Sequence, residues 1–71
     1  MNTAKQILNF IIKDKARGNT FQELNIQMRI MLKGVNVKGI MDNIIPDDPA
    51  LIEKLKEIAK EFEVDLKKMP V

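Results

Sequence analysis

The sequence predicts an all-α protein, a small bundle of three to four helices. Apolar residues recur three and four positions apart in four separate segments, which is the period of a helix. Capping residues, glycine or proline bound these segments, and no segment sustains the strict alternation of a strand. At 71 residues and 8.2 kDa, the chain is expected to form a single helical domain spanning residues 1–71.

The first helix is expected to begin at Thr3, whose hydroxyl suits an N-cap position. It is expected to end in a polar turn in which Gly18 adopts the left-handed conformation. Four of its apolar residues recur at helical spacing and form one stripe, and two more widen it. The stripe consists of Ala4, Ile7, Leu8 and Ile11, and the two flanking residues are Phe10 and Ile12.

The second helix has the clearest start in the sequence. The run from Thr20 to Glu23 matches a capping box, in which each of these two side chains satisfies the backbone amide of the other. Lys33 and Gly34 are expected to end the helix, as a favourable cation and a C′ glycine. The wider apolar stripe between these ends is expected to face the core, although methionines such as Met28, Met31 and Met41 could instead soften an interaction face. This stripe consists of Phe21, Leu24, Met28 and Met31, with Leu32 beside it.

A second apolar face of the same helix carries Ile26 and Ile30, four residues apart. A helix that is apolar on two faces either lies in the middle of a bundle or meets a partner subunit. So small a chain without disulfides is marginally stable alone, so that an efficient bundle and a homodimer sharing its core both remain open. Ile26 and Ile30 are therefore the candidate partner-binding or dimer face.

The rest of the chain is expected to add two helices. The third spans Val37–Ile45, although a short strand over residues 35–37 is an alternative. The fourth begins after Asp48 as the cap, with Pro49 in the first helical position. Its buried line is expected to consist of Leu51, Leu55, Ile58 and Phe62, with Ile52 and Ala59 beside them. Val64 and Leu66 are expected to fold back onto the core after this helix.

Residue types that carry much of enzyme chemistry are missing from the sequence. There is no Cys, His or Ser, which excludes disulfides, zinc fingers, haem attachment and the usual nucleophilic triads. An acidic cluster starting at Asp42 fails as a calcium loop, because Ile44 and Pro46 occupy ligand positions. Asp47 and Asp48 are better explained as helix caps. We therefore expect a protein that is not an enzyme and uses no metal or cofactor.

The apolar runs of the chain are short. None approaches the ~20 residues of a membrane span, and a polar Lys13-Asp14-Lys15 follows the first of them in place of a signal-peptide cleavage site. A cytoplasmic protein without membrane association is therefore expected. The three phenylalanines lie in or beside apolar stripes and are expected in the core, which disfavours binding of single-stranded nucleic acid.

Charge is distributed unevenly along the chain. Residues 1–41 carry a net charge of +5 (seven Lys and Arg against two acids), and residues 42–71 carry −3 (five against eight). The order of helices over residues 3–45, with Glu23-Leu24 after the threonine cap, resembles the tri-helical core of helix-turn-helix domains. The resemblance implies DNA binding by the basic half, although the second helix is longer than in that family and Asp42 opposes the role. The residues implied are Arg17, Arg29, Lys33, Asn36 and Lys38.

Two functions therefore stand as hypotheses. The first is a small non-enzymatic regulatory or protein-interaction module that acts through its helix faces on a protein partner or on a second copy of itself. The alternative is a helix-turn-helix-like DNA-binding protein. Lysines on the polar faces of amphipathic helices account for the basic half equally well without any nucleic acid.

Overall fold

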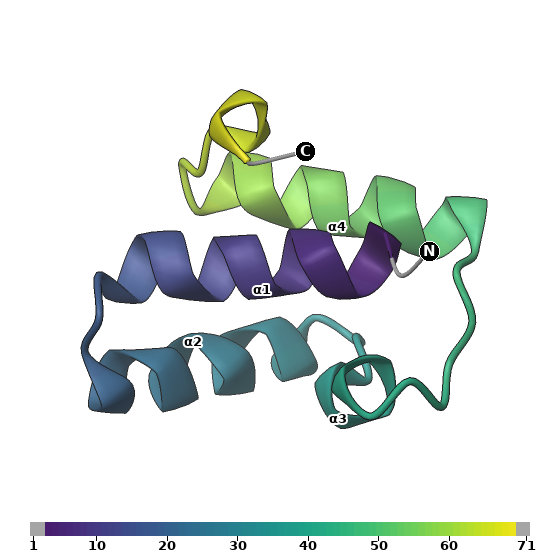
Figure 1. Cartoon of the computed structure of the whole chain (residues 1–71), viewed down its shortest axis with the longest axis horizontal. Helices are drawn as coiled ribbons and strands as arrows, with labels where there is room; N and C mark the ends of the chain where they lie inside the picture. The colour runs from purple at the N-terminus through teal and green to yellow at the C-terminus, as the bar shows by residue number, and fades with distance from the viewer. Residues whose placement is uncertain (1–2, 70–71) are drawn as a thin grey trace.

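The computed structural model describes residues 3–69 as a bundle of α-helices, which confirms the predicted all-α class (Figure 1). Within this range there is no strand, so the alternative of a short strand at residues 35–37 is wrong. The elements are α1 (Thr3–Ala16), α2 (Thr20–Leu32), α3 (Val37–Met41), α4 (Pro49–Glu61) and the short 3-10 helix η1 (Leu66–Lys68).

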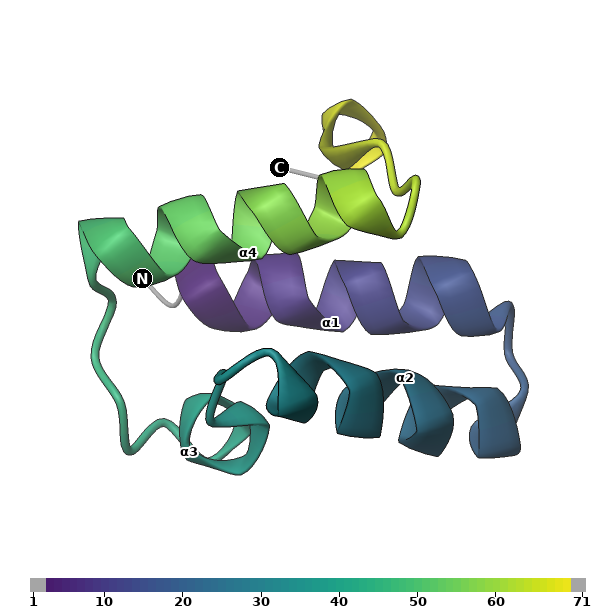
Figure 2. The ribbon, with the colours of Figure 1, turned by 180° about the vertical axis from the view of Figure 1, so that it is seen from behind.

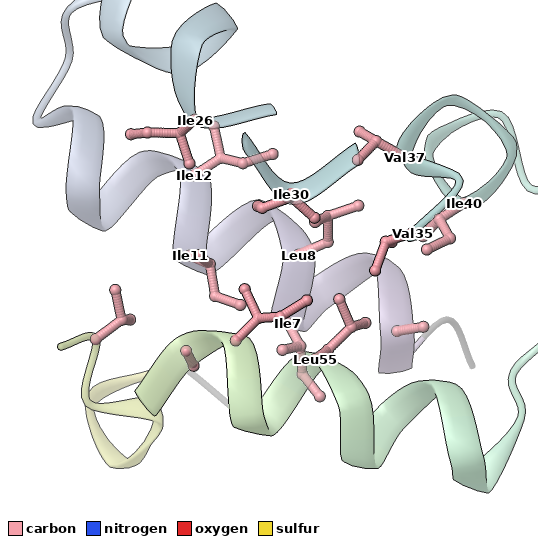
Figure 3. Packing of buried hydrophobic residues seen from close by; sticks show 14 of the residues in the cluster. Ile7, Leu8, Ile11, Ile12, Ile26, Ile30, Val35, Val37, Ile40 and Leu55 are labelled. Carbon is pink, nitrogen blue, oxygen red and sulfur yellow. The ribbon is translucent and has the colours of Figure 1, made fainter. Parts of the chain in front are cut away.

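Helix α1 is the central layer, with α2 on one side and α4 on the other (Figures 1 and 2). Ile26 and Ile30 point from α2 toward α1, while Leu55 of α4 meets α1 from the opposite side (Figure 3). Because α1 is covered on two sides, its stripe is buried as predicted. Its buried residues are Ala4, Ile7, Leu8, Ile11, Ile12 and Ala16.

The ends of the core come from the segments that follow α2 and α4. Val35 and Val37 are buried beside α1 and α2, and Val64 is buried after α4, with Leu66 packed against the core. The fold-back of Val64 and Leu66 is thus confirmed. Its cause is the end of α4, where Glu63 has a left-handed backbone (φ 59°) and the amide of Val64 donates to the carbonyl of Ala59 (2.8 Å).

Two helix boundaries differ from the prediction. Asn19, not Thr20, caps α2, because its side-chain oxygen accepts from the amide of Gln22 (3.2 Å). Helix α3 ends at Met41 rather than Ile45, because Asn43 is left-handed (φ 59°) and reverses the chain there. The predicted start of α4 is confirmed: the Asp48 carboxylate accepts from the amide of Ala50 (2.8 Å).

The N-terminus of α1 is capped by a residue that is distant in sequence. The Asp47 carboxylate accepts from the amides of Thr3 (2.9 Å) and Ala4 (3.1 Å), whereas Thr3 itself was expected to be the cap. These hydrogen bonds, first Thr3 and then Ala4, lower the pKa of the Asp47 carboxyl below its ordinary value of 3.8. Asp47 therefore attaches the segment between α3 and α4 to the start of the central helix.

We predict that Asp47→Ala lowers the melting temperature at about pH 7 by a few degrees, with Asp47→Asn intermediate because its amide oxygen still accepts one hydrogen bond. A lowered pKa in the folded state contributes stability above pH 3.8, and this contribution is lost as the pH falls through the lowered value. The difference in melting temperature between wild type and Asp47→Asn should therefore shrink with acidification.

Thermal unfolding followed by circular dichroism between about pH 7 and pH 2 measures this difference. Asp42→Asn is the matched control, because this nearby exposed carboxylate accepts no such pair of amides. A difference for Asp47→Asn that stays constant over the whole range would contradict the capping role.

Candidate functional site: the outer face of α2

The two apolar faces of α2 are placed opposite to the prediction. Ile26 (4% exposed) and Ile30 (0%), the residues predicted as a partner-binding or dimer face, lie in the core of the single chain, so neither side chain is exposed to a partner in this fold. The wider stripe that was expected in the core is in solvent instead. Its exposed fractions are Phe21 85%, Leu24 56%, Met28 62%, Met31 53% and Leu32 86%.

These five side chains form one continuous surface, called here the α2 outer face. Since each helical residue advances about 100° around the axis, all five fall within an arc of roughly 100°, on the side opposite Ile30. Polar, uncharged Asn25 and Gln27 flank this arc on either side. At ~600 Å² of exposed apolar surface, the face is at the upper end of the largest patches found on ordinary monomers.

The exposed side of α4 shows what a solvated helix in this bundle looks like. Helix α4 also packs one face on α1, and beyond its first turn its exposed positions are all charged, with a salt bridge between Glu53 and Lys56 (3.7 Å). Helix α2 carries only Glu23 and Arg29 between its caps. The apolar exterior is therefore a property of α2 alone among the two outer helices.

One local signal in the sequence assigns Ile30 to the core. Gly34 follows α2 in a left-handed conformation (φ 91°), and its amide donates to the carbonyl of Met31 (3.0 Å). In helix ends of this type the residue after the glycine packs against the residue that precedes the C-cap by three positions. Here these residues are Val35 and Ile30, and both are buried. The predicted C′ glycine thus carried information about orientation that the apolar pattern did not.

The residues implied for DNA binding do not gather on one surface. Arg17 lies in the turn between α1 and α2 with a left-handed backbone (φ 51°), while Asn36 and Lys38 lie at the opposite end of α2 (Figure 1). A helix of 13 residues separates these ends by about 20 Å. Arg29 lies on α2 between them.

Two of these residues have structural partners. The Asn36 side chain caps α3 by accepting from the amide of Gly39 (2.9 Å). The Lys33 ammonium is 2.8 Å from the Glu61 carboxylate and 5.9 Å from the centre of the Phe62 ring, so it joins the ends of α2 and α4. The candidate recognition helix α3 has five residues. This geometry gives the helix-turn-helix alternative no additional support.

The described residues show no buried polar side chain and no metal-binding cluster. Across residues 3–69, no polar or charged side chain is buried, and no group of three or more acidic side chains is placed to hold a metal ion. The grooves on the described residues are shallow and open: one of about 330 Å³ lies along α1, lined by Phe10, Lys13 and Met69 among others, and one of about 500 Å³ lies along α4. No helix in this range is long and apolar enough to cross a membrane.

No family model, curated protein or solved structure matches the chain. Among the described residues, the outer face of α2 is the feature that departs most from a solvated helical bundle.

We predict that the two faces of α2 respond oppositely to truncation. Ile30→Ala should lower the free energy of unfolding by about 2–5 kcal/mol, because it leaves a cavity in the core. Leu24→Ala should change it by no more than about 0.5 kcal/mol, because this side chain lies on the surface. Urea unfolding at low micromolar protein concentration, where association contributes little, measures both values. The reverse order of effects would mean that α2 is rotated by half a turn from the orientation described.

Proposed function

We propose that this protein is a non-enzymatic protein-interaction module, and that the α2 outer face is its docking surface. The observation that carries the proposal is the continuous exposure of five large apolar side chains, three of them more than 60% exposed, on a helix whose opposite face is core. Single exposed apolar residues are ordinary on protein surfaces, whereas a contiguous patch at the upper end of the range for monomers is often functional.

The residue types of this face suit binding. Phe21 supplies a large aromatic ring at one end of the face, and aromatic rings are the side chains that most often dominate binding energy. Met28 and Met31 are unbranched and adapt to the shape of an apposed surface. The neighbouring Asn25 and Gln27 provide an uncharged polar rim, which resembles the anatomy of protein interfaces.

Helix α2 is held rigidly behind this face. Asn19 caps its start, Ile26 and Ile30 anchor it to α1, and the Lys33–Glu61 ion pair joins its end to α4. A rigid face loses little conformational entropy when a partner binds, so more of the interaction energy contributes to affinity. This pre-organisation supports a docking role for the folded monomer.

We predict that a photoreactive benzoylphenylalanine in place of Phe21 cross-links to a protein partner in the cells that express the full chain. The ring replaced is 85% exposed, and the substitution preserves its aromatic character. The same residue in place of Phe10 is the matched control, because Phe10 lies half-buried in the groove on α1. The products are identified by mass spectrometry.

The docking role requires a product at position 21 that is identified, absent at position 10, and lost when Leu24→Lys is added to the same face. Equal products at both positions, or none at position 21, would contradict it. The identity of the product then separates a second copy of this chain from any other protein.

A further inference from the structure

We propose that the α2 outer face is covered by a second copy of this chain, with the two α2 helices antiparallel about a two-fold axis at the level of Ile26. The inference rests on the proposed docking role of this face and names its occupant. A two-fold dimer uses the same surface on both copies, so the face must be complementary to itself in shape and in charge.

The spacing of the apolar side chains meets the requirement of shape. In an antiparallel pair centred at the level of Ile26, position 24 of one copy lies opposite position 28 of the other, and position 21 lies opposite position 31. Leu24 is thus paired twice with Met28, and Phe21 twice with Met31. Leu24 and Phe21 thus each meet a flexible methionine, which adapts to their shape, while Leu32 lies opposite Thr20 at the edge of the contact.

The charges of α2 meet the second requirement. The helix carries one acid, Glu23, and one base, Arg29, and neither lies within the arc of the outer face. On the side of Arg29, an antiparallel second copy presents its uncharged Gln22 and Asn25. By contrast, α1 carries three lysines against one acid, so that two α1 helices would repel each other. Two copies therefore approach along α2 without bringing like charges together.

The area is adequate for a dimer that forms and dissociates. The ~600 Å² of the face, extended by its polar rim, approaches the ~800 Å² per partner of a standard interface. Since the core closes within one chain, we expect reversible association with a dissociation constant in the micromolar range rather than an obligate dimer.

The experiment is a charge exchange across the proposed axis, read by sedimentation equilibrium from about 10 µM to about 1 mM protein. The wild type should dimerise within this range. Leu24→Lys and Met28→Glu should each raise the dissociation constant at least about 30-fold, because each places an unpaired charge in the interface. An equimolar mixture of the two variants should recover dimers, because Lys at position 24 then faces Glu at position 28 of the other copy.

Gln6→Lys and Gln6→Glu are the matched controls, since they add the same charges at an exposed position of α1 and should leave the dissociation constant unchanged. A wild type that stays monomeric to about 1 mM would overturn the second copy as occupant. Dimers that the variants weaken but the mixture does not restore would overturn the antiparallel register, because parallel helices bring position 24 to position 24.

The two experiments together distinguish a missing dimer from a missing docking role. A monomeric wild type together with an identified product other than this chain at position 21 would keep the α2 outer face as a docking surface and remove only its proposed occupant. A monomeric wild type with no product at position 21 would remove both.

Discussion

The position of α1 between α2 and α4 is the constraint on which the rest of this structure depends. A bundle of this size has room for one central helix, and the stripe of α1 is wide enough to be covered from two sides. Every other helix packs on the outside of α1, so each outer helix leaves one face in solvent. The Asp47 carboxylate then fixes the start of α1 to the segment that leads into α4.

The two outer helices meet this constraint in different ways. Helix α4 buries Leu55 and Ile58 against α1 and covers its exposed side with charges, so it needs no further partner. Helix α2 buries Ile26 and Ile30 equally well, yet exposes residues such as Leu24 and Met28. Since both helices have the same neighbour and similar lengths, the difference comes from the sequence of α2 and not from the architecture.

The sequence predicted the parts of this fold that local patterns determine. The stripes of α1 and α4, the Asp48 cap and the Gly34 end of α2 follow from residues close in the chain. It failed where the decision is not local: α2 has two apolar faces, and the spacing of their residues does not indicate which of them packs on α1. The contact of Asp47 with Thr3 spans 44 residues, and no pattern of spacing indicates which helix a distant carboxylate caps.

The orientation of α2 separates folding from association. Had Ile26 and Ile30 formed the interface, the core would have been shared between two chains and neither copy would have folded alone. With both side chains inside one chain, the folded monomer already holds the α2 outer face on a rigid helix. Association then depends on concentration and not on folding. A second copy and any other partner would also compete for the same five side chains, so self-association would limit the amount of chain free to bind another protein.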